Sequence, residues 1–285
     1  MSPSSRSTMS DKSELYGLRL SPRPKYVALA TAALQRAIAY RMTTFNNVLA
    51  GLIWVGVLYY LWKTVFTANP QVGGFDWERM RTYILVSYAV NTLLSFYTEA
   101  RITNAIRTGA VATELVRPID FLTAQLAEAL GAAVMEGLLG SVFAVLLGLL
   151  VFDVAPSVSL VATVSFVVSV GLGFLVKFLI GYLTALLCFW TINGLGLLWA
   201  RSAVTNIFSG AIIPLALFPE PLKQVALALP FQAIINTPLA IYLGDVQGAA
   251  LAAALAVQIG WIVALWLLAR WVWGPCVRSL RIQGG

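Results

Sequence analysis

Long apolar stretches fill most of this 285-residue sequence, and they constrain its fold more than any other feature. A hydrocarbon core of roughly 30 Å requires about 20 helical residues, and inside it a backbone satisfies its hydrogen bonds only as a helix or a closed barrel. Because the apolar runs are uninterrupted rather than alternating, they predict helices. The expected fold class is an all-α membrane protein with six transmembrane helices, near residues 45–66, 83–98, 122–151, 158–189, 203–217 and 249–271.

Composition agrees with a membrane protein. With 59% hydrophobic and 11% charged residues, the chain has too little polar surface to coat a soluble fold of this size. Residues 1–23 are rich in Ser and charge and are predicted to form a disordered cytoplasmic tail. Residues 24–285 are predicted to form a single transmembrane domain.

The placement of Lys and Arg predicts the orientation. With the N-terminus inside, fourteen of these residues fall in cytoplasmic segments and four on the external side, while Lys177 lies within a span. Both termini are therefore expected in the cytoplasm, which requires an even number of crossings. The net charge of +7 follows from this topology, so it gives no support to a nucleic-acid partner.

Residues 24–41 differ from the spans because their apolar side chains recur on one side only. Pro24 suits the first turn of a helix, and Lys25 and Arg36 lie away from the apolar side. This pattern predicts an N-terminal interfacial amphipathic helix. A short cytosolic extension of the first span is the alternative.

Two linking segments carry the most specific local patterns. Between the second and third spans, residues 106–110 and 114–121 read as a short charged helix bounded by Gly109 and Pro118, suited to a groove on a soluble partner. Before the last span, five prolines interrupt an apolar segment, so it cannot form one continuous helix: Pro214, Pro219, Pro221, Pro230 and Pro238. A plain external loop is the alternative for this second segment.

In both segments the chain resembles the type-2 ABC exporter permeases, in the branch of small six-span subunits. The resemblance runs from about Tyr26 to Trp271. It implies a re-entrant helical hairpin at residues 219–238 and a coupling helix at residues 103–114 that docks on a separate ATPase. The implied ATPase-coupling residues are Thr103, Ile106, Arg107, Gly109, Glu114 and Arg117. The alternative for Arg107 and Arg117 is that they only mark the cytoplasmic side.

The resemblance also implies the partners. The chain has no Gly-x-x-x-x-Gly-Lys-Ser/Thr loop, so ATP and Mg are expected on two copies of an ATP-binding cassette ATPase. A second, related but non-identical permease chain and membrane lipids complete the expected assembly, in the bacterial cytoplasmic (inner) membrane. The implied activity is export of a small amphiphile, drug or lipid-like molecule.

Two other functions stay open on the sequence alone. One is a non-transporting membrane anchor or assembly subunit, and the other is a secondary transporter. Catalysis by the chain itself is not expected, because it contains no His and only two Cys, which are too few for a zinc site.

Polar residues inside the predicted spans are candidates for a substrate path. They form stripes at helical spacing on the second and fifth spans: Ser87, Asn91, Ser95, Thr205, Asn206 and Ser209. Hydrogen bonding between helices is the equally plausible alternative. The intramembrane charges are Glu128, Glu136 and Lys177, and a structural pairing of Lys177 with either carboxylate is preferred to substrate binding.

Overall fold

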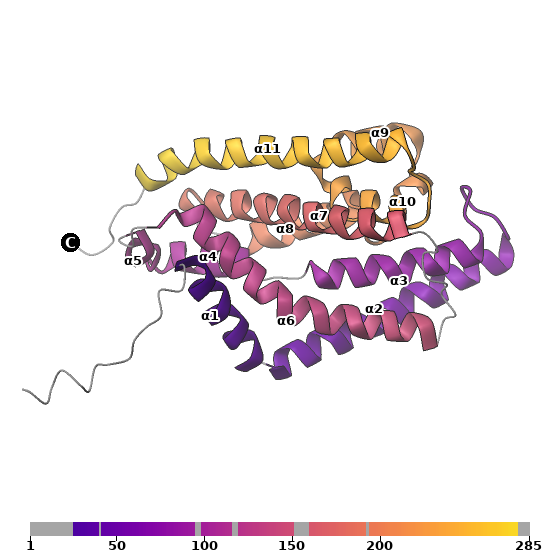
Figure 1. The fold of residues 1–285 in the computed structure, drawn as a ribbon, viewed down its shortest axis with the longest axis horizontal. Helices are drawn as coiled ribbons and strands as arrows, with labels where there is room; N and C mark the ends of the chain where they lie inside the picture. The colour runs from indigo at the N-terminus through magenta and orange to yellow at the C-terminus, as the bar shows by residue number, and fades with distance from the viewer. Residues whose placement is uncertain are drawn as a thin grey trace, which may run out of the picture.

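The computed structural model describes residues 25–39, 41–94, 98–115, 119–150, 160–191 and 194–278. The long helices run roughly along the longest axis of the molecule, with α11 at one side and α2 at the other (Figure 1). The elements are α1 (Lys25–Ala39), α2 (Arg41–Ala68), α3 (Trp77–Leu93), α4 (Thr98–Arg107), α5 (Val111–Leu115), α6 (Phe121–Leu150), α7 (Leu160–Leu186), η1 (Leu187–Phe189), α8 (Gly194–Phe208), η2 (Leu215–Leu217), α9 (Glu220–Ala228), η3 (Pro230–Ala233), α10 (Asn236–Tyr242) and α11 (Ala249–Arg278). The predicted tail, residues 1–23, lies outside the described residues.

The all-α fold class is confirmed for the described residues, which contain helices and no β-strand. Three stretches among them are long and apolar enough to cross a membrane: Leu49–Ala68, Leu160–Phe189 and Ala249–Arg278. In the first and third, only 11% of the most apolar window is buried, so large side chains such as Ile53 and Trp271 face outward. Such a surface suits contact with lipid, where the helix satisfies its own backbone hydrogen bonds.

Helices α3 and α8 begin six or more residues earlier than the apolar stretches that predicted them. Helix α3 begins at Trp77, because the side chain of Asp76 caps it by accepting a 2.8 Å hydrogen bond from the Arg79 amide. Helix α8 begins at Gly194 rather than near residue 203 and ends at Phe208. The chain then turns at Gly210, whose φ of 85° is in the left-handed region that favours glycine.

The segment predicted as one coupling helix, residues 103–114, is divided in the structure. Helix α4 ends at Arg107, and α5 begins at Val111. Between them Gly109 has a φ of 75°, which an α-helix does not accommodate. The result is a tight turn, residues 107–110, that is exposed at the end of the bundle where α5 lies (Figure 1).

Helix α1 packs closely against α6. A Cβ added at Gly131 of α6 would lie 2.1 Å from the carbonyl oxygen of Ala30, so the two backbones meet where a larger residue would not fit. Ala33 of α1 is buried. The helix expected at residues 24–41 is therefore present, and its apolar side contacts α6; its place at a membrane interface stays a prediction.

At the end that carries α5, the start of α6 is fastened to the end of α11. The rings of Phe121 and Trp273 stack with centroids 4.6 Å apart, and Asp120 pairs with Arg270. Burial alone would raise the pKa of Asp120, but hydrogen bonds from the hydroxyl and amide of Thr123, at 2.7 and 3.0 Å, and the Arg270 guanidinium outweigh it and lower this pKa below its ordinary value of 3.8.

At the opposite end, the segment expected as a re-entrant hairpin contains α9, η3 and α10, held to the long helices by polar contacts. Gln258 of α11 is fully buried, and its amide donates to the carbonyls of Ala233 and Ser169 at 2.7 and 3.1 Å. The backbone amide of Asn236 donates to the backbone carbonyl of Ser209 at 2.9 Å. These bonds hold the hairpin against α7, α8 and α11.

Candidate functional site

A network of five polar side chains joins α1, α4, α5 and α6 near the exposed turn. We call Arg36, Arg101, Glu114, Gln125 and Glu128 the polar joint. Glu128 of α6 accepts from Arg36 of α1 and Arg101 of α4, each at 3.0 Å. Arg101 also pairs with Glu114 of α5 at 3.3 Å and donates to Gln125. Each carboxylate therefore has a cationic partner from another helix.

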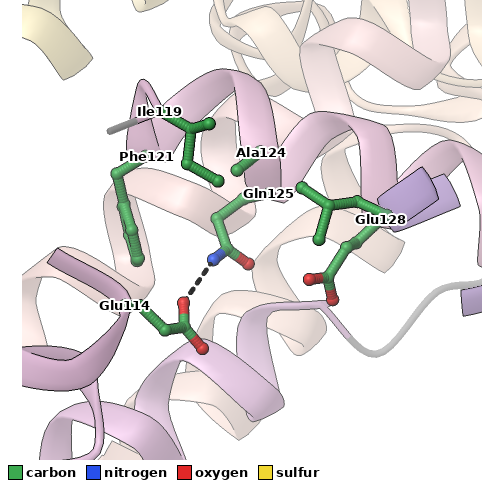
Figure 2. Close-up of a pocket in the computed structure, with 7 residues that line it drawn as sticks. Glu114, Ile119, Phe121, Ala124, Gln125 and Glu128 are labelled. Carbon is green, nitrogen blue, oxygen red and sulfur yellow. Dashed lines mark hydrogen bonds between the residues drawn. The ribbon is translucent and has the colours of Figure 1, made fainter. Parts of the chain in front are cut away.

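The joint is largely shielded from solvent. The side chain of Glu128 is 12% exposed and Gln125 is buried, whereas Arg36 is 54% exposed. Figure 2 shows Gln125 reaching from α6 toward Glu114, to which its amide donates at 3.0 Å, with Glu128 on the next turn of the same helix. Because opposite charges attract more strongly when they are withdrawn from water, this network ties α5 to α6 more firmly than a surface pair would.

The structure separates the predicted ATPase-coupling residues into an exposed and an inward-facing group. Arg107 and Gly109 are exposed on the turn, and within the described part of the chain Arg107 donates to Asn104, one turn back on α4, at 3.3 Å. Thr103 is 5% exposed with its hydroxyl 3.6 Å from the Cys188 sulfur, so it faces the bundle interior. Ile106 is partly buried against the core and Glu114 belongs to the joint, while Arg117 lies outside the described residues.

A pocket of about 90 Å³ lies between α2, α3 and α8, and it brings together three of the predicted substrate-path residues. Ser87 and Asn91 come from α3, and Asn206 comes from α8. We call this space the polar pocket. Its other walls are mostly apolar or aromatic: Trp54, Val55, Leu58, Ile84, Tyr88, Ala211 and Ile212. The two polar stripes predicted on different spans thus face a shared space.

The remaining path candidates are distributed differently. Thr205 in the last turn of α8 and Ser209 just after its end are 4% and 0% exposed, and among the described residues their hydroxyls have no hydrogen-bond partner. Neither lines the polar pocket. Ser95 lies outside the described residues, as does the side chain of Glu136.

Among the described residues, Lys177 does not pair with Glu128, and its alternative pairing with Glu136 stays a prediction because that side chain lies outside the described residues. Glu128 is engaged by two arginines of the joint, whereas the ammonium of Lys177 on α7 donates to Asn91 Oδ1 at 3.4 Å. Lys177 instead lies within electrostatic reach of Glu99 and Arg201, which pair with each other across α4 and α8. We call Glu99, Lys177 and Arg201 the charge cluster.

An apolar groove of about 420 Å³ lies on the other side of α3, between α6 and α7. Its walls include Val90, Leu94, Val134, Val167 and Phe174, and Ser141 is the one polar side chain among its lining residues. The two faces of α3 therefore border spaces of different character. The polar pocket contains three polar side chains and is linked to Lys177 through Asn91, whereas the walls of the groove are almost entirely apolar.

A comparison with protein families places the chain. The family model for ABC-2 family transporter proteins matches residues 52–284, which covers most of the sequence and both polar sites except Arg36. This chain is a member of the ABC-2 transporter family. The resemblance stated from the sequence is thereby confirmed, and with the three long apolar helices it makes the chain a multi-pass membrane protein. A comparison with curated proteins found no match.

Several residues of this ABC-2 family member that matter most were not assigned a role from sequence. Arg36 and Arg101 served only as markers of the cytoplasmic side, and Gln125 was not considered at all. The available signal was the strong amphipathic pattern of α4, which sets Glu99 and Arg101 among apolar residues. Among the described residues, no group of three His, Cys, Asp or Glu side chains converges as metal ligands would.

Proposed function

We propose that this chain is the transmembrane permease subunit of an ATP-binding cassette exporter, which moves a small amphiphile, drug or lipid-like molecule out of the cytoplasm or the inner leaflet. The observation that carries the proposal is the family match over residues 52–284. The sequence contains no phosphate-binding loop of its own, which supports a separate motor. ATP and Mg would be bound by that motor, an ATP-binding cassette ATPase present in two copies.

The proposed topology has six crossings in the bacterial cytoplasmic membrane, with both termini in the cytoplasm. The crossing helices are α2, α3, α6, α7, α8 and α11. Helix α8 has 15 residues and so extends only about 22 Å, less than the roughly 30 Å of a hydrocarbon core. A re-entrant hairpin at residues 219–238 would fill the remaining depth beside it, and the contacts of Gln258 and Asn236 support that placement.

Coupling to the motor is proposed at the exposed turn between α4 and α5. A cationic, exposed side chain such as Arg107 suits a groove on a soluble partner. Displacement of the turn would reach α6 and α1 through the polar joint, because Arg101 and Glu114 contact Gln125 and Glu128. The proposed coupling element is therefore the turn with α4 and α5, rather than one helix over residues 103–114.

The exporter is proposed to contain a second permease chain, related to this one but not identical. Closure of the two ATPase copies on ATP would push on the exposed turn and open the space between the two permeases toward the outside. The polar pocket lies on the face of α3 and α8, which supports these helices as walls of the path. Lipid would surround the outward-facing apolar side chains of α2 and α11.

The test is purification of the tagged chain in mild detergent, identification of the bound chains, and measurement of ATP-dependent movement of amphiphiles in vesicles. An exporter subunit brings down an ATPase and supports movement that requires ATP. A membrane anchor brings down a partner without movement, and a secondary transporter moves its substrate without ATP. Either of these last two results would contradict the proposal.

A charge reversal tests the coupling element within the assembled complex. Arg107→Glu is expected to lower amphiphile-stimulated ATPase activity by about tenfold, because loss of one charge-assisted contact costs about 1.5–3 kcal/mol. Lys223→Glu is the matched control, since Lys223 lies on α9 at the opposite end of the bundle. Equal stimulation in the Arg107 variant and the control would refute this assignment.

A further inference from the structure

The ammonium of Lys177 has too few partners for a cation inside a bundle. It carries three N–H donors, yet among the described residues its one hydrogen bond goes to Asn91 Oδ1, at the long distance of 3.4 Å. An ammonium removed from bulk water loses much of its solvation and requires compensation by charge or by hydrogen bonds. A single weak acceptor does not supply it.

The nearby carboxylate is already committed elsewhere. Glu99 pairs with Arg201, and both side chains are mostly buried, at 14% and 11% exposed. Glu99 also packs tightly on α7, where a Cβ added at Gly181 would lie 2.2 Å from its carboxylate oxygen. Among the described residues, the charge cluster thus holds two cations against one carboxylate, and the excess positive charge lies on the side of Lys177.

The polar pocket adjoins this excess charge. Asn91 lines the pocket and accepts from Lys177, so its amide NH₂ group is the part still able to donate to a ligand. Asn206 contributes a second amide to the pocket wall, and the structure records no hydrogen bond for it among the described residues. Amide donors backed by a cation are the groups that bind an oxyanion.

The size of the pocket indicates what fits in it. Its volume of about 90 Å³ has room for several waters but is well below the roughly 300–1,000 Å³ of a site that encloses a drug-sized ligand. A compact charged group fits, and an attached apolar chain would extend along Trp54, Val55 and Leu58 on the wall formed by α2.

We propose that the polar pocket receives the anionic headgroup of an amphiphile, with the charge balanced by Lys177 and the oxygens bound by the amides of Asn91 and Asn206. The inference rests on the proposed export function and narrows its substrate to amphiphiles that carry a phosphate, sulfate or carboxylate. Lys177 thereby acts in substrate selection, in place of the structural pairing that the sequence suggested.

The experiment uses the complete complex with its ATPase, reconstituted in vesicles of zwitterionic lipid. ATPase stimulation is titrated with lysophosphatidylglycerol and with lysophosphatidylcholine of the same acyl chain, which differ in net charge. The wild-type complex is expected to reach half-maximal stimulation at about tenfold lower concentration of the anionic probe, the effect of one charge-assisted hydrogen bond. In Lys177→Gln this preference is expected to shrink to about twofold or less.

Lys223→Gln is the control, because Lys223 of α9 does not line the pocket and pairs with Glu220, and it is expected to keep the wild-type preference. Competition by inorganic sulfate would support recognition of the free anion as well, whereas stimulation that sulfate does not reduce would support an anion borne on a lipid. Equal wild-type responses to the two lipids would overturn the inference, and this comparison needs no variant. That result leaves the export function standing, while absence of any copurified ATPase would remove the function itself.

Discussion

Glu128 is the residue whose loss should most weaken the polar joint. Its carboxylate is 12% exposed and accepts from Arg36 and Arg101 at 3.0 Å each. Glu128→Gln keeps the shape of the side chain and removes the charge, so two guanidinium groups remain beside a neutral amide. Helix α1 then loses its ionic link to α6, and Arg101 of α4 keeps its contacts with Glu114 and Gln125.

The expected cost follows from the exposure of each partner. The pair with Arg36 is more than half open to solvent on the arginine side, so screening limits it to about 0–1 kcal/mol. The pair with Arg101 is better shielded, and a hydrogen bond to a charged group contributes about 1.5–3 kcal/mol. Together they predict a loss of about 1.5–4 kcal/mol in the free energy of unfolding.

The assay is unfolding in mixed micelles with increasing denaturing detergent, followed by the fluorescence of the nine tryptophans. Double-mutant cycles that combine Glu128→Gln with Arg36→Met or Arg101→Met separate the two pairs. We expect a coupling energy of about 1.5–3 kcal/mol with Arg101 and below about 1 kcal/mol with Arg36.

The control is Glu220→Gln on α9. Glu220 is 66% exposed and pairs with Lys223 at 3.5 Å, so its loss is expected to change the unfolding free energy by less than about 0.5 kcal/mol. If the effects of Glu128→Gln and Arg101→Met simply add, the two residues do not interact and the joint does not transmit force between α4 and α6.

Three further perturbations test the packing at each end of the bundle. Gly131→Val places a side chain against a backbone carbonyl of α1 and is expected to lower the free energy of unfolding by about 1–3 kcal/mol. Gly260→Ala is the control, because nothing lies within 4 Å of the added Cβ, and it is expected to be neutral or stabilising. A comparison of the unfolding midpoints of the two variants tests this difference. Gln258→Leu removes the side-chain donor to the Ala233 carbonyl and the acceptor of the buried Ser169 hydroxyl, so it is expected to cost about 1–3 kcal/mol. Limited proteolysis of the α9–α10 segment is a second readout. Burial raises the pKa of Asp120, but hydrogen bonds from Thr123 outweigh it, so the net shift of this pKa is downward. The ionised carboxylate therefore stabilises the folded state above pH 3.8, and this stabilisation is lost as the pH falls through the folded-state pKa. Asp120→Asn should remove this acid dependence from the free energy of unfolding.

The sequence predicted the helices whose position depends on local hydrophobicity. The apolar pattern of residues 24–41 corresponds to α1, and the prolines between residues 214 and 238 correspond to the broken helices α9, η3 and α10. These features depend on residues close together in the chain, where burial and the missing amide of proline act directly.

The beginning of α8 was missed for a reason that lies outside its own segment. Arg201 was assigned to a cytoplasmic segment by its charge, and the predicted stretch began just after it, at residue 203. In the structure the guanidinium pairs with Glu99 of α4, 102 residues earlier, which allows the helix to carry this charge in its middle. A charge of this kind can be assigned only once its distant partner is known.

The partners in the polar joint were hidden for the same reason. Counting Arg36 and Arg101 as markers of the cytoplasmic side treats each arginine as independent, whereas both converge on Glu128 from separate helices. The sequence indicated that Glu128 required compensation, but the partner it suggested was Lys177, another charge inside a predicted span. Only the packing of α1 and α4 against α6 brings the two arginines to this carboxylate.

Helix α4 contributes one residue to the charge cluster and one to the polar joint. Glu99 and Arg101 are two residues apart, so on a helix they point to different sides. Glu99 pairs with Arg201 of α8 beside Lys177, and Arg101 pairs with Glu128 of α6. Rotation or translation of α4 must therefore disturb the charge cluster and the polar joint together, because each is anchored to this one helix by a shielded ion pair. Since α4 leads directly into the exposed turn, a force applied at that turn reaches the wall of the polar pocket without passing through the termini of the chain.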